Sequence, residues 1–358
     1  MDNGFSDYSK TSGQTHYSKA YSRINKVKVL NSIRNADNIT RAEIVRETGI
    51  SPATITRIVD ELIFNQKLVK QIGNGEFKRG RPPKIVQFNG DNSYVIGLDW
   101  GRTRINAALA DLNAKVIKEI NTPSIAHQDF NKDLKNVLSI IDYLINQSEI
   151  EPGKILGIGI GAAGFIDKEG VVEYSPKFNW KNVNVIKPIN NRFNIPVIIN
   201  NSVHAMAIGE LYYGNHGLND FIFVSIDYGI GSGIISNGKH LKGYDGISGE
   251  FGHTQVIPTS IIKRKCVCGN YNCLECFSAG WGIEYNSRLQ IKDHPDSLVN
   301  LLASHDKNLI DINILTEAAK KGDKFAIDIF LEAADILGAS ISNFTNILNP
   351  QAVIWGDP

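Results

Sequence analysis

Cysteines and long apolar runs are scarce in this chain of 358 residues. Its only four cysteines all lie in one stretch, CVCGNYNCLEC, at residues 266–276. No run of eighteen apolar residues occurs, which argues against a membrane-spanning helix, and the polar start MDNGFSDYSKTSGQTHYSKAY lacks the apolar centre of a secretory signal. These absences predict a soluble cytoplasmic protein without a membrane partner, in which thiols stay reduced.

The net charge of +1 conceals an uneven distribution. Residues 1–89 carry 15 Lys and Arg against 8 Asp and Glu, whereas residues 90–358 carry 23 against 29. The two parts therefore have net charges of about +7 and −6, and a basic front part is typical of a domain that binds a polyanion. The length also predicts two or three globular domains.

Helical periodicity begins near residue 24. The preceding residues 1–22 show no such pattern, and we expect a flexible arm there or, alternatively, a tail that grasps DNA. A first helix, ending near NADN, is predicted by four apolar residues at helical spacing, Ile24, Val27, Leu30 and Ile33. A second, short helix should begin at the capping box TRAE, formed by Thr40 and Glu43, and stop at Gly49.

The segment SPATITRIVDELI predicts a third helix, with Ser51 as its N-cap and Pro52 in its first turn. One apolar stripe is shared by Ile55, Ile58, Val59, Leu62 and Ile63. The succession of short helix, glycine turn and helix is typical of a helix-turn-helix, although a plain three-helix bundle gives the same spacing. The side chains that we expect to contact DNA from this helix are Ser51, Thr54, Thr56 and Arg57.

Two β-like runs at residues 67–72 and 84–88 flank a Gly-rich basic segment and predict a hairpin, or wing. Its tip carries Lys78, Arg79 and Arg81 around the sequence RGRP. Because this tip directly follows a recognition-type helix, its pattern favours contact with an A·T-rich minor groove over a solvated basic linker. Residues 23–89 are therefore predicted to form a winged helix-turn-helix domain that binds operator DNA.

Strands and helices alternate over residues 90–358, which is typical of an α/β fold. The first cycle has a hairpin at YVIGLDWGRTRINAALADLN, a helix over residues 132–147 and the strand ILGIGIGAAGFID. A second cycle ends in a long helix from about residue 325 and the strand QAVIWG. We therefore predict two α/β lobes, over residues 90–200 and 201–358, with a cleft between them.

The clustered cysteines favour a structural zinc site. Two disulfides within eleven residues would be strained, and both they and a redox pair at Cys266 and Cys268 fit a reducing compartment less well. Zinc takes four thiolate or imidazole ligands, and the spacing Cys-x-Cys-x4-Cys supplies three of them from one loop. On spacing alone, the fourth ligand is either Cys276 or a histidine.

The order of seven motifs resembles the ROK family of bacterial sugar kinases and sugar-responsive repressors. These motifs are GLDWGRT, GIGAAGFID, IPVIINNSVHAMAIGE, GIGSGI, GEFGH, CVCGNYNCLE and NPQAVIWG. The winged front part resembles the repressor branch, which includes xylose-responsive and N-acetylglucosamine- or glucose-responsive repressors. The resemblance implies a two-lobed actin-like (ribonuclease H-like) body, a homodimer or dimer of dimers, and further helices beyond Pro358.

The resemblance also implies two sets of ligands. The histidine of GEFGH binds zinc in the family, so the implied zinc ligands are His253, Cys266, Cys268 and Cys273, with Cys276 as a spare packed thiol. The two glutamates beside these ligands contact sugar hydroxyls in the family, and the implied sugar-binding residues are Asn201, Ser202, Glu250, His253 and Glu275. The zinc would then preorganise the sugar pocket.

The same motifs depart from those of ROK kinases. The kinases use an aspartate as the base that deprotonates the sugar, and Ser202 stands at that position. In the phosphate loops Arg102 replaces a glycine and Tyr228 a threonine, which disfavours ATP, although glycines there also serve tight turns. Lys177, where kinases have asparagine, favours a phosphorylated or acidic sugar unless it is a plain surface lysine.

We therefore predict a non-enzymatic repressor of carbohydrate-utilisation genes, whose body binds a sugar or sugar phosphate without phosphorylating it. The alternative is an ATP-dependent ROK sugar kinase with an accessory DNA-binding domain.

Overall fold

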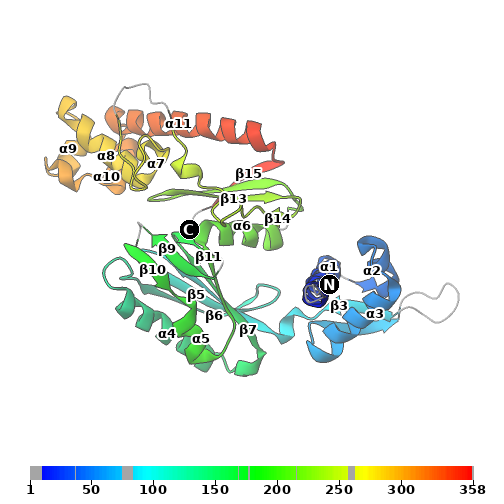
Figure 1. The fold of residues 1–358 in the computed structure, drawn as a ribbon. Helices are drawn as coiled ribbons and strands as arrows, with labels where there is room; N and C mark the ends of the chain where they lie inside the picture. The colour runs from blue at the N-terminus through cyan, green and yellow to red at the C-terminus, as the bar shows by residue number, and fades with distance from the viewer. Residues whose placement is uncertain are drawn as a thin grey trace, which may run out of the picture. The chain divides into compact units, whose positions relative to one another are not determined.

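The computed structural model describes residues 10–36, 38–74, 84–167, 169–175, 178–214, 216–256 and 263–356, with only the backbone described for residues 10–21 and 74 (Figure 1). The chain divides into two compact units. One comprises Met1–Ile96, Ala108–Lys118 and Leu144–Leu156, and the other comprises Gly97–Ala107, Glu119–Tyr143 and Gly157–Pro358. Within the described ranges, no helix combines the length and apolar character needed to cross a membrane.

The described residues of the front part form the helices α1 (Lys10–Asn35), α2 (Arg41–Thr48) and α3 (Pro52–Asp60), and α3 continues as the π-helical turn η1 (Glu61–Asn65). The predicted capping box of α2 is confirmed. The backbone N–H of Thr40 donates to the Glu43 carboxylate at 2.8 Å, and the Thr40 hydroxyl accepts from the Glu43 N–H. Gly49 ends the helix at a φ of 68°, where glycine is favoured.

Helix α1 begins at Lys10, so the prediction of an arm over residues 1–22 was wrong from Lys10 onward. The predicted apolar stripe was also wrong in part. Ile24 and Val27 are 53% and 51% exposed, whereas Val29 and Ile33 are fully buried. The turn that contains Val29 and Ile33 packs into the core and supplies the nucleus of the helix. Once a nucleus exists, the preceding polar residues can extend the helix at little further cost in free energy.

A three-stranded sheet of order β1-β3-β2 completes the front part, with strands β1 (Ile39–Thr40), β2 (Val69–Asn74) and β3 (Lys84–Phe88). Strands β2 and β3 form the predicted antiparallel hairpin. One core joins the three helices to this sheet, and its buried members are Val29, Ile33, Ile39, Ile44, Ile55, Ile58, Val59, Leu62, Val69 and Val86. The predicted tip residues Lys78, Arg79 and Arg81 lie outside the described residues.

Ser51 precedes α3 as predicted, but its side chain makes no capping hydrogen bond. Its hydroxyl instead donates to the Thr54 hydroxyl oxygen at 2.9 Å. The predicted N-cap position of Ser51 is therefore confirmed, but the capping hydrogen bond from its side chain is absent.

A five-stranded sheet follows, of order β11-β7-β4-β5-β6. Its strands are β4 (Tyr94–Trp100), β5 (Arg104–Asp111), β6 (Val116–Pro123), β7 (Ile155–Ala162) and β11 (Val197–Asn201). Strands β11 and β7 are parallel, as expected where a helical crossover, here including α5 (Ile186–Phe193), joins them. Helix α4 (Phe130–Asn146) and a small sheet of β8 (Phe165–Ile166), β9 (Val171–Ser175) and β10 (Trp180–Asn184) belong to the same half of the sequence.

The second α/β sheet has the order β14-β13-β12-β15, with β12 (Phe221–Ile226), β13 (Ile230–Ser236), β14 (Lys239–His240) and β15 (Ala352–Gly356). Helix α6 (Ser202–Tyr213) packs closely on β13, because a Cβ atom at Gly233 would lie 2.4 Å from that of Ala207. The remaining helices are α7 (Glu275–Ser278), α8 (Gly280–Gln290), α9 (Leu298–Leu302), α10 (Ile312–Lys320) and α11 (Lys324–Leu348). The predicted fold class, a winged helix-turn-helix followed by a mixed α/β body, is confirmed.

Candidate metal centre and adjoining cavity

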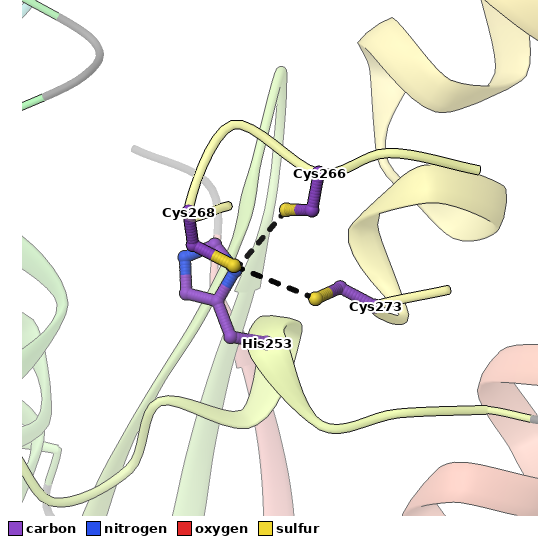
Figure 2. A group of neighbouring side chains, drawn as sticks. All are labelled: His253, Cys266, Cys268 and Cys273. Carbon is purple, nitrogen blue, oxygen red and sulfur yellow. Dashed lines mark hydrogen bonds between the residues drawn. The ribbon is translucent and has the colours of Figure 1, made fainter. Parts of the chain in front are cut away.

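Four side chains from two segments converge beside the second sheet (Figure 2). His253 ends the 3₁₀ turn η4 (Phe251–His253), while Cys266, Cys268 and Cys273 come from the loop before α7. Their ligand atoms all lie within 4.8 Å of one another. Nδ1 of His253 is 3.5 Å from Sγ of Cys266, and the Sγ atoms of Cys268 and Cys273 are 3.6 Å apart.

This geometry fits a tetrahedral zinc ion. Zn–S bonds of about 2.3 Å place two thiolates of a tetrahedron about 3.8 Å apart, close to the observed sulfur separation. The thiolate is the form that binds metal, and hydrogen bonding, chiefly with Cys276, lowers the pKa of Cys266 to about 3. Burial raises the pKa of Cys273, and a bound cation would oppose this by stabilising its thiolate.

Local backbone bonds give the cysteine loop its shape. Asn272 closes it, because its side-chain oxygen accepts from the Arg264 N–H at 2.8 Å and its own N–H donates to the Arg264 carbonyl at 2.7 Å. Gly269 supplies a φ of 94° at the turn between the second and third thiols. Cys276 is not one of the four clustered ligands: it is buried, its thiol contacts Cys266, and it lies 3.9 Å from the Arg264 carbonyl.

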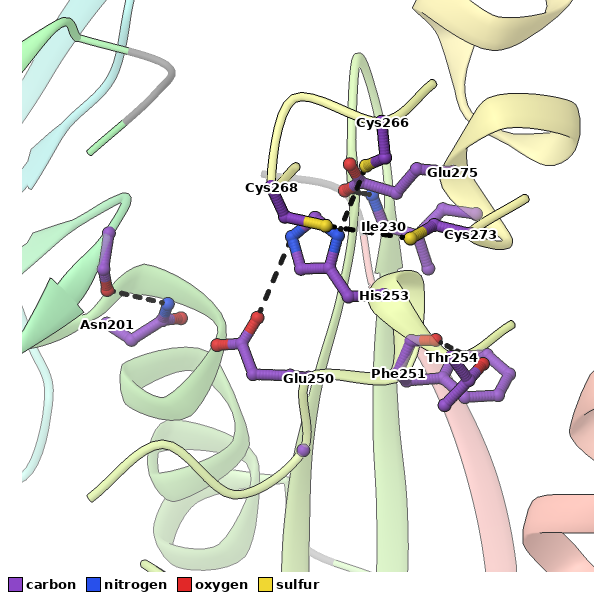
Figure 3. A network of polar contacts seen from close by, with 12 residues as sticks. Asn201, Ile230, Glu250, Phe251, His253, Thr254, Cys266, Cys268, Cys273 and Glu275 are labelled. Atoms are coloured by element: carbon purple, nitrogen blue, oxygen red, sulfur yellow. Dashed lines mark hydrogen bonds and ion pairs between the residues drawn. The ribbon is translucent and has the colours of Figure 1, made fainter. Parts of the chain in front are cut away.

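A cavity of about 360 Å³ adjoins the cluster. All five residues of the predicted sugar-binding set line it, namely Asn201, Ser202, Glu250, His253 and Glu275. Most of these are labelled in Figure 3. The cysteine loop reaches the same cavity through Cys268 and through Val267, whose side chain is 57% exposed. Sequence reasoning missed Val267, although a residue between two ligands of a Cys-x-Cys segment is expected to point away from the metal.

The carboxylates of Glu250 and Glu275 make different contacts with the protein. Glu275 is buried, and its Oε1 accepts from the Ile230 N–H at 2.7 Å. Glu250 lies 3.9 Å from Nε2 of His253, whose Nδ1 faces Cys266, so the imidazole has one nitrogen toward the thiols and one toward the cavity (Figure 3). Burial raises the pKa of both glutamates, and the hydrogen bond with Cys266 raises the pKa of His253.

Asn201 and Ser202 stand where β11 meets α6. The side-chain oxygen of Asn201 caps the helix by accepting from the Val203 N–H at 2.9 Å, and its NH₂ group donates to the Gly164 carbonyl at 3.4 Å (Figure 3). Ser202 is the first residue of α6. The end of the helix is therefore fixed at the cavity by a side chain that also lines it.

A second cavity, of about 610 Å³, is bounded by the loop between β4 and β5. It shares five residues with the first cavity, namely Arg102, Ala163, Ser202, Asp227 and Tyr228. The Arg102 guanidinium lies 5.6 Å from the centre of the Tyr228 ring, within the range of a cation–π contact. The large side chains of Arg102 and Tyr228 therefore stand at the border of the two cavities. A phosphate cradle needs accessible backbone N–H groups, and bulky side chains disfavour such a cradle.

The predicted DNA-contacting residues of α3 and its N-cap are accessible. Ser51, Thr56 and Arg57 are exposed and Thr54 is half-buried, while the opposite face of α3 is in the core. Lys177, like the three basic residues of the wing tip, lies outside the described residues. A solvent-facing arginine on a helix whose other face is fully packed suits contact with a nucleic acid.

The fold combines a winged helix-turn-helix with an α/β body, and the body has a candidate metal centre beside a cavity. This combination is typical of proteins that join a DNA-binding domain to a ligand-binding body. The winged helix-turn-helix DNA-binding family matches residues 23–63, and the ROK family matches residues 95–357. The chain therefore belongs to the ROK family.

Its relatives include both regulators and kinases. The xylose repressor of Caldicellulosiruptor bescii is 33% identical over 337 residues, which cover 94% of this chain and 83% of the relative. A solved ROK family transcriptional regulator, a homologue of the Escherichia coli Mlc protein, has a TM-score of 0.77 at 28% identity and covers 94% of this chain and 83% of its own. A Streptomyces griseus ROK glucokinase, solved with glucose and AMPPNP, has a TM-score of 0.63 at 26% identity and covers 74% and 83%.

Proposed function

We propose that this chain is a sugar-responsive transcriptional repressor, which binds operator DNA through residues 23–89 and a sugar or sugar phosphate through its body. The observation that carries the proposal is the lining of the 360 Å³ cavity, where Glu250 and Glu275 accompany Ser202 at the start of α6. Carboxylates are strong, directional acceptors for sugar hydroxyls. A serine at position 202 lacks the basicity to deprotonate a sugar, so the cavity supports binding without phosphoryl transfer.

The metal cluster supports this role by joining two segments of the cavity wall. We propose that Nδ1 of His253 and the thiolates of Cys266, Cys268 and Cys273 hold one structural zinc ion. The ion supplies bonds that keep the turn after Glu250 and the loop before Glu275 together. The protein's own residues then present Nε2 of His253 and the two carboxylates to the ligand.

In the front part we propose that α3 enters the major groove with Thr56 and Arg57 facing the bases or phosphates, and that Ser51 and Thr54 contact the backbone. Lys78, Arg79 and Arg81 of the wing would read an adjacent minor groove. One recognition helix reads only a half-site, so we propose that a homodimer, or a dimer of dimers, binds two related half-sites. The body would comprise lobes over residues 90–200 and 201–358.

Binding of sugar and binding of DNA would be coupled, because each ligand would prefer a different conformation of the protein. A ligand shifts such an equilibrium only through its differential affinity for the two states, and the coupling is reciprocal. Operator DNA should therefore change sugar affinity by the factor by which sugar changes DNA affinity, commonly about 5 to 150-fold.

The test uses Glu250→Gln, with Glu332→Gln on the exposed face of α11 as a matched control. Calorimetric titrations with D-xylose, D-glucose, N-acetylglucosamine and their phosphates identify the effector, and DNA affinity is measured with and without it. Glu250→Gln should abolish the sugar response and leave DNA binding of the free protein intact, whereas Glu332→Gln should behave like the parent. A sugar that emerges phosphorylated from incubation with ATP would instead establish the alternative, a ROK kinase with an accessory DNA-binding domain.

A further inference from the structure

Two buried side chains hold the loop that carries Glu250. His204 on α6 donates its Nε2–H to the Ser248 carbonyl at 2.8 Å, and Ser232 on β13 donates its hydroxyl to the Gly249 carbonyl at 2.7 Å. Each of these two side chains is only 2% exposed. Two successive carbonyls directly before Glu250 are thus fixed from two different elements of the fold.

The loop depends on these side chains for its direction. Gly249 has a φ of 82°, and a Cβ atom there would lie 2.6 Å from the Ser232 carbonyl oxygen, so the backbone passes close to β13 in a conformation that belongs to no strand or helix. Ser248 and Gly249 are half-buried, and carbonyls outside the ladders of strands and helices need other partners. His204 is the partner of the Ser248 carbonyl, and the Gly249 carbonyl accepts from Ser232 and from the Phe251 N–H, after which the loop turns Glu250 toward the cavity.

The His204 imidazole has a defined tautomer. Because the Ser248 carbonyl can only accept, Nε2 carries the proton, and Nδ1 has no hydrogen-bond partner among the described residues. Burial lowers the pKa of His204, the bond to Ser248 partly offsets this, and the charge of Lys242 lowers the pKa further. The neutral form that makes this bond therefore persists at neutral pH.

His204 also belongs to the other half of the cavity wall. Its backbone N–H lies 3.5 Å from the Asn201 side-chain oxygen, the same atom that caps α6. One residue thus touches the cap at the start of α6 through its backbone and the Glu250 loop through its side chain.

We propose that His204 and Ser232 are positioning residues, which fix Glu250 relative to the start of α6 so that the cavity is preformed for a polyhydroxylated ligand. The ligand class rests on the proposed function, but the positioning itself does not. Preformed acceptors bind more tightly, because less ordering is required when the ligand enters.

Hydrogen exchange tests the positioning without any ligand, in the full-length protein. The amides of Ser248, Phe251 and His253 are hydrogen-bonded within or beside the loop and report on it. His204→Phe and Ser232→Ala should speed their exchange by about tenfold, as expected for the loss of one buried hydrogen bond, without changing exchange in the front part. His204→Gln keeps an N–H donor and should restore protection.

His240→Phe is the packing control, because it alters the ring beside His204 but leaves the bond to Ser248 in place. Loop exchange in this variant should stay within about twofold of the parent. Equal exchange in His204→Phe and His204→Gln, or acceleration across the whole body in His204→Phe, would overturn the proposal.

Titration with D-xylose, D-glucose, N-acetylglucosamine and their phosphates then separates positioning from function. For whichever sugar binds the parent, His204→Phe and Ser232→Ala should raise Kd by about tenfold, and His204→Gln should recover most of the affinity. An unchanged Kd in His204→Phe would overturn the proposed role in the cavity. If none of the sugars binds the parent, the proposed function fails, while the exchange experiment still decides whether the two residues position the loop.

Discussion

The winged front part and the ROK body place their candidate binding residues in opposite ways. On α3, Thr56 and Arg57 are exposed on one short helix whose other face is packed into a local core. In the body, Asn201, Glu250 and Glu275 come from distant parts of the sequence and meet at one cavity beside the candidate metal centre. The front part is also basic, with 15 Lys and Arg against 8 Asp and Glu in residues 1–89.

The difference follows from the two kinds of ligand. A DNA duplex is large and uniformly charged, so an exposed helix can meet it with side chains that stay in water until the complex forms. A small polyhydroxylated molecule must be surrounded, and its polar partners must be held in place while partly buried. The body therefore depends on fixed contacts, such as the bond between Glu275 and Ile230, that the front part does not need.

The largest expected effect concerns the metal cluster. Cys273→Ser or His253→Ala should lose the metal, because structural zinc sites in small peptides bind with roughly 10–16 kcal/mol, and that free energy depends on the full ligand set. Cys276→Ser, the matched control, should keep one zinc per chain. Elemental analysis of the purified variants checks this. Retention of zinc by His253→Ala together with its loss from Cys276→Ser would reverse the ligand assignment.

The next effect separates the two faces of α3. Ile58 is 1% exposed in the front core, so Ile58→Ala should destabilise that part by about 2–5 kcal/mol through lost burial and the cavity left behind. Arg57→Ala, its exposed neighbour, should change stability by less than about 0.5 kcal/mol. Calorimetric unfolding of the full chain measures both. Similar losses for the two variants would mean that Arg57 is a packing residue.

A smaller effect is expected on DNA affinity. Arg57→Ala should weaken binding by about 1–3 kcal/mol while leaving sugar affinity unchanged, because the side chain would contact base edges or phosphate. Fluorescence anisotropy at one fixed salt concentration checks this with DNA selected by the protein from a random pool. Arg192→Ala, which breaks an ion pair with Asp142 in the body, serves as the control. Equal weakening by both variants would indicate nonspecific charge attraction.

The smallest effect is a change in acid stability. Burial, with lesser contributions from His204 and Lys242, lowers the pKa of His240 from 6.5 to about 4. The unfolded chain therefore binds this proton more readily than the folded chain, so stability is lost as pH falls from about 6.5 toward 4. His240→Phe should make the stability of the body less dependent on pH in this window. A pH dependence identical to that of the parent, measured by thermal unfolding, would contradict this.

The local sequence predicted structure well where the contacts that determine an element lie within a few residues of one another. The capping box of Thr40 and Glu43 and the wing hairpin were predicted correctly, since each depends on neighbouring residues or on a simple alternation. Ser51 takes the predicted N-cap position, but its side chain makes no capping bond and donates to the Thr54 hydroxyl, a choice between neighbours that residue type does not determine. The start of α1 was missed, because packing farther along the helix determines how far its polar turns extend.

By itself, the sequence determined that three thiols lie in one loop and that α3 has an apolar and a polar face, since residue spacing alone fixes both. Only the tertiary structure decided which residues surround the cavity. It brought His253 to the thiols, Glu250 and Glu275 to the end of α6, and His204 to a carbonyl 44 residues away. The physical reason is that a buried polar group must find a partner wherever the packed chain supplies one, and sequence separation places no limit on that choice.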